Sequence, residues 1–136
     1  MPKMRLNIVT PEKVVYDNEI ERVTVRTIDG DRGIMPEHIP LITGLDIGAI
    51  RIKEDNEEQI LAATKGYMEV RPEETIILVD SAEFADKIDV ERAEAAKKRA
   101  EDRLGSKTEN INEKRAELAL QRALNRLKVT KGNNFE

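Results

Sequence analysis

The sequence has no cysteine and no tryptophan, a single histidine, and only two tyrosines and two phenylalanines. Without cysteine, the chain has no disulfide framework, no thiolate metal site and no cysteine nucleophile. With His38 as its one histidine, it cannot build a histidine-rich zinc site and is poorly supplied for a Ser-His-Asp triad. We therefore expect an aliphatic core and no hydrolytic or redox active site.

Long apolar runs are also absent. The longest stretches do not exceed about five residues, whereas a helix needs about 20 apolar residues to cross a bilayer. The N-terminal segment MPKMRLNIVTPEK has basic residues but no apolar region behind them, unlike a signal peptide. We expect no direct insertion into a membrane.

Charge and composition change together near residue 86. Residues 1–86 carry 10 Lys and Arg against 18 Asp and Glu, a balance of −8, whereas residues 87–136 carry 13 against 9, a balance of +4. All five prolines lie at or before Pro72, and after Phe84 the helix formers Ala, Glu, Lys, Arg and Leu dominate. The sequence therefore predicts two parts with different partners, divided at residue 86.

The first part has the pattern of an antiparallel β-sandwich. Short runs rich in Val, Ile and Thr alternate apolar and polar residues, as Val23 and Val25 do between Arg22, Thr24 and Arg26. Turn residues separate these runs, and no helical pattern lies between them. The runs are MRLNIVT, KVVYDN, IERVTVRT, GAIRIKE, EEQILAATKG, YMEVRP and ETIILVD.

The second part, residues 87–136, is predicted to form an αα-hairpin with helices over about 87–104 and 107–127. Asp86 is a candidate cap for the first helix, and Gly105 is a candidate left-handed stop at its end. Together with the sandwich, this gives an α+β fold in two parts.

The second helix is expected to open with a capping box, in which Ser106 stands three residues before Glu109. The tail KVTKGNNFE after it is expected to fray. Both helices have thin apolar stripes that bury little area, so the hairpin should be held weakly and could adopt more than one position. The stripes are Ala93, Ala96, Ala100 and Leu104 in the first helix and Ala116, Leu120, Ala123, Leu124 and Leu127 in the second.

Each helix also carries a row of arginines with the spacing +7, +4, and an antiparallel hairpin can bring parts of the two rows together. The rows are Arg92, Arg99 and Arg103, and Arg115, Arg122 and Arg126. One interpretation is that acidic neighbours three or four positions away simply compensate these charges on a solvated face. The other is an anion site for phosphates or an acidic partner. Nucleic acid is disfavoured, because the hairpin lacks interleaved aromatics and the first part is acidic.

Two loops in the first part deserve a functional interpretation. The Gly30-Asp31-Arg32-Gly33 segment lacks the spacing of a phosphate loop, and no helix follows it, so it predicts a hairpin turn. His38 lies between two prolines in Met35-Pro36-Glu37-His38-Ile39-Pro40, which predicts an extended rim loop with a surface contact rather than a catalytic base.

Three motifs, in order along the chain, resemble a known family. The first is Gly30-Asp31-x-Gly33-Ile34-Met35-Pro36-x-His38-x-Pro40-Leu41-x-Thr43-x-Leu45-x-x-Gly48. The second is Gly66-Tyr67-Met68-Glu69-Val70 followed by Thr75-Ile76-Ile77-Leu78-Val79-Asp80-x-Ala82-Glu83. The third is Ile88-Asp89-x-x-Arg92-Ala93. Together they resemble the epsilon subunit of the bacterial F-type rotary ATP synthase, in its bacillus-type form.

This resemblance implies a non-catalytic rotor subunit on the cytoplasmic face of the bacterial cell membrane, attached peripherally. The sandwich would bind the gamma subunit and rest on the c-ring of the proton-translocating synthase. The hairpin would either fold on the sandwich or extend into the alpha/beta catalytic hexamer and block ATP hydrolysis. One regulatory ATP, bound but not hydrolysed, would stabilise the folded position, and the resemblance leaves its Mg²⁺ requirement open.

The resemblance also implies roles for individual residues. Asp89 would hold the adenine or the helix start, and Arg92 would frame the nucleotide; Ile88 and Ala93 complete their motif. The remaining ATP-site residues would be three arginines that address the phosphates, Arg99, Arg122 and Arg126, and Glu83, which would close the site from the sandwich. The c-ring and rotor contacts would be Asp31, Glu37 and His38.

Three positions depart from the pattern of the family. Glu37 stands where glycine is frequent, Lys65 replaces the first glycine of a usual pair, and Glu91 replaces an apolar residue within the nucleotide motif. The alternative function is a purely structural coupling module, with a permanently docked hairpin that does not sense nucleotide.

Overall fold

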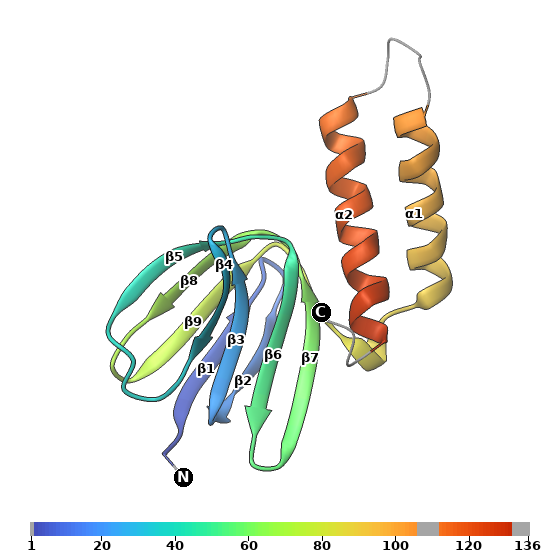
Figure 1. The fold of residues 1–136 in the computed structure, drawn as a ribbon. Coiled ribbons are helices and arrows are strands. Elements are labelled where there is room, and N and C mark those ends of the chain that lie inside the picture. Colours follow the sequence, from blue (N-terminus) through green and yellow to red (C-terminus); the bar gives the residue numbers. More distant parts are fainter. Residues whose placement is uncertain (1, 106–111, 132–136) are drawn as a thin grey trace.

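The computed structural model describes residues 2–105 and 112–131, which form a β-body followed by two helices (Figure 1). This confirms the α+β fold expected from the sequence, a β-sandwich with a C-terminal helical hairpin.

The strands form one hydrogen-bonded sheet in the order β10-β7-β6-β3-β5-β8-β9-β1-β2, with β4 paired to β3 outside this path. The sheet curls on itself and encloses the core (Figure 1). Its strands are β1 Met4–Val9, β2 Val14–Ile20, β3 Arg22–Thr27, β4 Gly30–Ile34, β5 Leu41–Leu45, β6 Gly48–Glu54, β7 Glu57–Ala63, β8 Gly66–Val70, β9 Glu74–Val79 and β10 Ala82–Phe84.

The pairing differs in one respect from the expected antiparallel sandwich, because β1 pairs with β9 in parallel. Three strands, β4, β5 and β10, lie outside the runs that the alternation pattern identified. The first two have the compositions GDRGI and LITGL, in which glycines interrupt the apolar alternation. Partners elsewhere in the chain, rather than local composition, make these segments strands.

The core is aliphatic, as the scarcity of aromatics predicted. Val23 and Val25 are buried in β3, while Arg22 and Arg26 on the same strand are exposed and Thr24 is half-buried. The largest fully buried side chains of the β-body come from strands throughout the sheet: Leu6, Ile8, Ile20, Ile34, Ile50, Ile52, Leu61, Met68 and Ile77.

The first helix begins later than expected. A 3₁₀ turn, η1 Ala85–Lys87, leads into α1 Val90–Gly105. The predicted cap at Asp86 is wrong, because Asp86 lies inside η1 and Asp89 caps α1 instead. The predicted left-handed stop is also wrong, since Gly105 lies within α1 and has no positive φ.

The second helix, α2 Glu113–Thr130, is displaced toward the C-terminus relative to the expected span. Its cap is Asn112, whose Oδ1 accepts a hydrogen bond from the backbone N–H of Arg115 at 3.1 Å. The capping box at Ser106 and Glu109 lies outside the described residues. The tail does not fray from Lys128 as expected, because α2 continues and fully buries Val129.

The apolar stripes of the helices are buried in part. Leu104 and Leu124 remain 37% and 44% exposed, so the hairpin interface depends mainly on alanine. The buried members are Ala93, Ala100, Ala116, Ala123 and Leu127. Small side chains allow the two helices to approach closely, but they remove little apolar surface from water.

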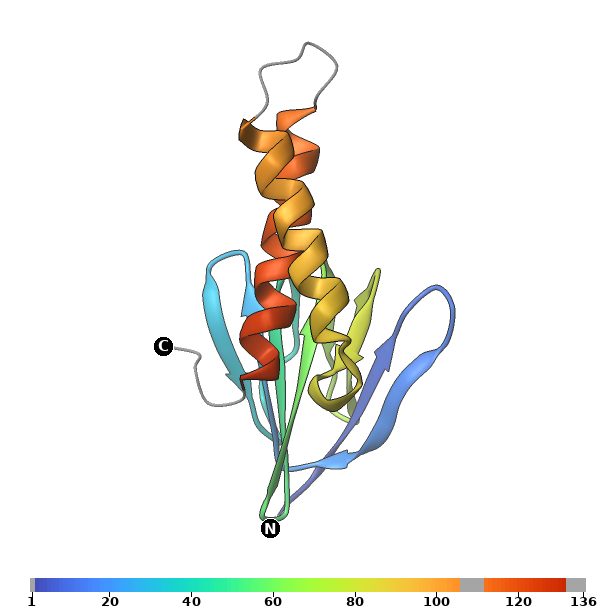
Figure 2. The same cartoon turned by 90° about the vertical axis from the view of Figure 1, so that its right-hand side faces the viewer.

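The hairpin lies against the β-body at one end, the hairpin root, which comprises the start of α1 and the end of α2 (Figures 1 and 2). Figures 1 and 2 show α1 and α2 side by side, with the start of α1 and the end of α2 next to the sheet and their other ends pointing away from it. The end of α2 contacts the sheet at β6 and β7. The hairpin root is therefore where the two parts of the chain meet.

Candidate functional site

A cleft of about 250 Å³ opens at the hairpin root, between the start of α1, the end of α2 and the segment around β10. Its lining combines two carboxylates, three guanidinium groups and small or apolar side chains. The lining residues are Ser81, Glu83, Ile88, Asp89, Arg92, Ala93, Ala96, Arg99 and Arg126.

Asp89 forms one end of this cleft and caps α1. Its Oδ1 accepts a hydrogen bond from the backbone N–H of Arg92 at 3.1 Å, and its carbonyl accepts from the N–H of Ala93 at 3.0 Å. A carboxylate at this position satisfies a helix N–H that would otherwise lack a partner and interacts favourably with the helix dipole. Asp89 therefore has a structural role that explains its presence without a ligand.

An ion pair joins the hairpin to the β-body across the cleft. Arg126 Nε on α2 donates to Glu83 Oε1 on β10 at 2.7 Å. Both side chains are a little over one-third exposed, so the pair is open to solvent. Partial exposure limits its contribution to stability and leaves Arg126 accessible to another anion.

Two further guanidinium groups line the cleft without a fixed partner. Within residues 2–105 and 112–131, Arg92 and Arg99 form no ion pair, and both side chains are exposed. With Arg126, they set three positive charges against the two carboxylates of Glu83 and Asp89. Because arginine does not lose its proton, this excess favours an anion with several oxygens, such as a phosphate chain.

The volume of the cleft limits what it can hold. Ligand pockets for small molecules usually enclose roughly 300–1,000 Å³, so about 250 Å³ at the hairpin root is enough for only part of a nucleotide. The arginines fit phosphates chemically. A nucleotide is larger than this cleft and would extend beyond it.

The structure brings most of the expected ATP-site residues together. Seven of them line the cleft: Glu83, Ile88, Asp89, Arg92, Ala93, Arg99 and Arg126. Ile88 and Ala93 are 9% and 2% exposed and also serve packing. Arg122 is different, because it is half-buried on α2 and does not line the cleft.

The sequence did not identify Asn125 and Val129, which attach α2 to the sheet. The side-chain amide of Asn125 donates to the carbonyls of Gly48 and Ala63, and Val129 is fully buried with Ala62 and Ile88. The sequence carried one signal for the contact of Asn125, because asparagine is a poor helix former and lies here within a helix rich in Ala, Leu and Arg.

The expected rotor contacts lie toward opposite ends of β4: Asp31 is near the end of α2, whereas Glu37 and His38 lie in the loop that follows Ile34. Asp31 in β4 pairs with Arg26 in β3, Oδ1 to Nη1 at 3.3 Å. The β3–β4 hairpin expected here is present, but its turn lies at residues 28–29, and the predicted turn at residues 30–33 is wrong because Gly30–Ile34 forms β4. His38 Nδ1 lies 2.6 Å from the carbonyl oxygen of Ile39.

The loop between β4 and β5 is not extended throughout, as had been expected. The N–H of His38 donates to the carbonyl of Met35 at 3.2 Å and closes a turn, with Pro36 and Glu37 at its centre. Glu37 has φ 68°, the left-handed value that favours glycine at this position of a turn. This conformation explains why glycine is frequent at this position, and Glu37 adopts it as a residue with a Cβ.

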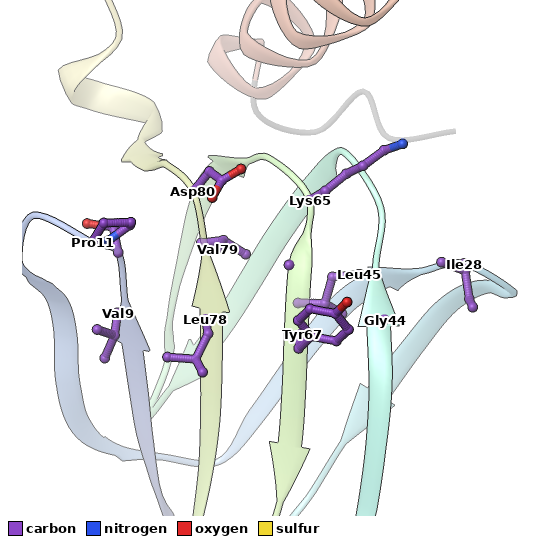
Figure 3. A pocket seen from close by; sticks show the side chains of 12 residues that line it. Val9, Pro11, Ile28, Gly44, Leu45, Lys65, Tyr67, Leu78, Val79 and Asp80 are labelled. Atoms are coloured by element: carbon purple, nitrogen blue, oxygen red, sulfur yellow. The ribbon is translucent and has the colours of Figure 1, made fainter.

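The outer face of the sheet carries an apolar groove of about 760 Å³, which shares no lining residue with the arginine cleft. Tyr67 and Leu78 are register partners on β8 and β9, and Gly44 on β5 and Val9 on β1 continue this row across four strands. Figure 3 shows Tyr67 and Leu78 on neighbouring strands, with Ile28 at the turn after β3. Ile28, Tyr67 and Leu78 are 69%, 66% and 51% exposed, so this face has the character of a docking surface.

In residues 2–105 and 112–131, no group of three His, Cys, Asp or Glu side chains is arranged to hold a metal ion. Neither of the described helices is both long enough and apolar enough to cross a membrane.

Curated relatives resemble the chain over nearly its full length. It is 53% identical over 129 residues to the ATP synthase epsilon chain of Bacillus velezensis and 52% identical over 129 residues to that of Bacillus subtilis. It is 48% identical over 130 residues to the ATP synthase epsilon chain of Halalkalibacterium halodurans. Each alignment covers 95% of this chain and 98% of the relative.

Solved structures show the same fold at lower identity. A chain in the cryo-EM structure of the Euglena gracilis mitochondrial ATP synthase aligns with a TM-score of 0.78 at 19% identity, covering 89% of this chain and 78% of that one. A chain in the central stalk and c-ring of the Tetrahymena thermophila mitochondrial ATP synthase aligns with a TM-score of 0.62 at 18% identity, covering 95% and 97%.

Two family models divide the chain between them. Residues 3–85 match the β-sandwich domain of the ATP synthase delta/epsilon chain, and residues 86–131 match its long α-helix domain. With the identity to bacillus epsilon chains over almost the whole length, these matches show that the chain belongs to the ATP synthase delta/epsilon family, as an epsilon chain.

Proposed function

We propose that this chain, a non-catalytic subunit of ATP synthase, works in the rotor of a proton-translocating synthase and senses ATP through its hairpin root. Residues 1–86 form a docking domain and residues 87–136 a regulatory hairpin. With ATP in the cleft the hairpin remains folded, and without it the hairpin extends toward the alpha/beta hexamer and inhibits hydrolysis.

The observation that carries this proposal is the convergence of three arginines from two helices on one cleft. Arg92 and Arg99 come from α1, and Arg126 comes from α2. An anion bound by all three links α1 to α2 at the hairpin root, next to Glu83 on β10. Phosphates thereby stabilise one position of the hairpin, which is what a nucleotide sensor requires. Arg122 is proposed to join the phosphates by reorientation.

The apolar outer face supports the docking role. A subunit of a rotary complex must bury a large surface against its neighbours, and Ile28, Tyr67 and Leu78 offer an exposed apolar area for the gamma subunit. Glu37 and His38, in the loop after β4, are proposed to face the c-ring, and Asp31, toward the other end of β4, is proposed as a second rotor contact. This arrangement corresponds to a peripheral position on the cytoplasmic face of the membrane.

Isothermal titration of the chain with ATP tests the sensor. Binding is expected for the wild type, and the substitutions Asp89→Ala and Arg92→Ala should each weaken it about tenfold or more, since hydrogen bonds to charged groups contribute about 1.5–3 kcal/mol. Lys98→Ala is a matched control, because it removes an exposed charge from α1 outside the cleft. Absence of binding at millimolar ATP, or equal binding by all variants, would refute the sensor.

Removal of residues 87–136 from the assembled synthase tests the brake. ATP hydrolysis should rise while the complex still assembles, because the docking face lies entirely in the sandwich. Unchanged hydrolysis in an intact complex would exclude inhibition by the hairpin and leave the coupling role in place.

The contacts of Asn125 and Val129 favour a second candidate, the structural module with a permanently docked hairpin. Hydrogen exchange of the α1 and α2 amides with and without ATP separates the two functions. Slower exchange with ATP supports the sensor, whereas identical exchange supports the permanently docked module.

A further inference from the structure

The hairpin is fastened to the sheet by two residues one helical turn apart on α2. Asn125 Nδ2 donates to the carbonyl of Gly48 at 2.8 Å and to that of Ala63 at 3.3 Å. Gly48 and Ala63 are register partners at the end of the β6–β7 ladder. Val129 lies on the same side of α2, fully buried against the sheet. A single amide thus bridges both strands of the hairpin on which α2 stands.

Apolar packing at this junction is modest. Apart from Val129 and Ile88, the small cluster between the helices and the sheet consists mostly of alanines. Its members are Ala62, Ile88 and Val129, with Ala49, Ile60 and Ala85 packed against them. Alanine buries little surface, so the polar contacts of Asn125 account for a large share of what holds α2 in place.

Helix propensity does not explain Asn125. Asparagine in a helix interior makes helix formation less favourable than alanine does, by roughly 0.7 kcal/mol. The rest of α2 is rich in Ala, Leu and Arg. The side chain reaches residues 62 and 77 positions away in the sequence. Its two amide hydrogens match the two carbonyls, since each hydrogen can serve one acceptor.

We propose that Asn125 is the positioning residue that latches the hairpin in its docked position, independently of the neighbouring Arg126. The two side chains contact different strands: Asn125 binds the end of the β6–β7 ladder, and Arg126 binds Glu83 on β10. An anion that takes Arg126 away from Glu83 therefore leaves the latch closed. The regulatory role of the latch rests on the proposed function, but the latch itself does not.

The latch is also built to open. A polar cleft of about 420 Å³ lies beside Asn125, lined among others by Thr24, Arg26 and Lys128. Water in this cleft can replace the bonds of the amide and of the two carbonyls when α2 leaves. When α2 leaves the sheet, no buried polar group then lacks a hydrogen-bond partner, which keeps the barrier to undocking low.

Hydrogen exchange of the α2 amides around Asn125, measured on the full chain without nucleotide, tests the latch. Asn125→Ala should exchange at least about fivefold faster than wild type, because two hydrogen bonds are lost. Helix propensity predicts the opposite, since alanine stabilises α2. Asn125→Asp should exchange faster still, because its carboxylate would face two carbonyl oxygens.

Gln121→Glu is the matched control, since it also converts an exposed amide of α2 to a carboxylate but lies outside the contacts with the sheet. The chain has no cysteine, so a spin-label pair at Glu73→Cys and Lys98→Cys can report the distance between sandwich and hairpin. Asn125→Asp should broaden this distance toward longer values, whereas Gln121→Glu should not.

Equal or slower exchange in Asn125→Ala, with an unchanged distance in Asn125→Asp, would overturn the latch. Slow exchange in the strands shows that the sandwich remains folded in each variant. A separate measurement adds ATP to the wild type. If the wild type does not bind ATP, the nucleotide sensor is refuted, but the results on Asn125 obtained without nucleotide remain valid.

Discussion

Arg126 and Glu83 form an ion pair between α2 and β10, with Nε and Oε1 2.7 Å apart. The carboxylate of Glu83 binds the guanidinium group of Arg126, which the proposed site needs for a phosphate. A carboxylate and a phosphate oxygen accept the same hydrogen bonds, so the two compete for Arg126. The docked hairpin without nucleotide therefore already contains an internal substitute for the anion.

Replacement of Glu83 by glutamine should loosen the hairpin root slightly. Partly exposed ion pairs contribute about 0.2–1 kcal/mol and weaken as salt is added. We expect α2 in Glu83→Gln to exchange its amide hydrogens faster than wild type at low salt, and the difference to shrink at high salt. Exchange rates measured at two ionic strengths check this.

Glu94→Gln provides the control, because Glu94 is exposed on α1 outside the cleft and the substitution removes the same charge. If Glu94→Gln reproduced the effect, the cause would be the net charge of the chain rather than the pair with Arg126.

The sequence identified most of the cleft because its residues belong to a local motif and to regular rows. Asp89 and Arg92 are three positions apart at a helix start, and Arg92 and Arg99 are seven apart on one helix face. The spacing alone could not show that Arg126 lines the cleft while Arg122 does not. Arg122 and Arg126 are one turn apart on the same face of α2, so the difference depends on where along α2 the cleft lies, which contacts with the sheet determine.

What the sequence did not show depends on distant partners. The contact of Asn125 with Gly48 and Ala63 joins residues far apart in the chain, and no local pattern encodes it. The parallel pairing of β1 with β9 likewise appears only in the folded sheet. Helix ends were misplaced for a local reason, because several capping residues compete and Asp89, rather than Asp86, accepts the helix N–H.

Replacement of Gly66 by alanine should destabilise the sandwich. A Cβ at Gly66 would lie 1.9 Å from the carbonyl oxygen of Leu78, so the paired strands β8 and β9 would have to separate. Overpacking of this kind costs about 1–3 kcal/mol or more, which urea unfolding would measure. Gly44→Ala is the control on the neighbouring strand, since its Cβ would make an ordinary contact of 3.5 Å with Ile28. Equal stability of the two variants would contradict this account.

Replacement of Glu37 by glycine should stabilise the chain or leave its stability unchanged. A left-handed φ at a residue other than glycine destabilises the folded state by roughly 1–2 kcal/mol, and glycine relieves this strain. Glycine also increases the conformational entropy of the unfolded chain, which lowers stability by about 0.4–1 kcal/mol, so the two effects partly cancel. Glu73→Gly is the control, because Glu73 has no positive φ and should lose stability by the entropy term alone. Thermal unfolding should rank Glu37→Gly above Glu73→Gly, and the reverse order would contradict the turn conformation.

Tyr16 should make the stability of the sandwich sensitive to alkaline pH. Burial, and secondly the hydrogen bond from its hydroxyl to Glu54 Oε2 at 2.9 Å, raise the pKa of Tyr16 to about 12. A tyrosine in an unfolded chain has a pKa near 10, so the folded state favours the neutral phenol. Its contribution is fully present below about pH 10 and is lost as the pH rises toward about 12. Lysines titrate in the same range, so the measurement is a difference: urea unfolding of wild type and Tyr16→Phe, which cannot ionise, across this pH range. Wild type should lose stability faster than Tyr16→Phe with rising pH, and parallel curves would show that Glu54 and burial do not hold the proton on Tyr16.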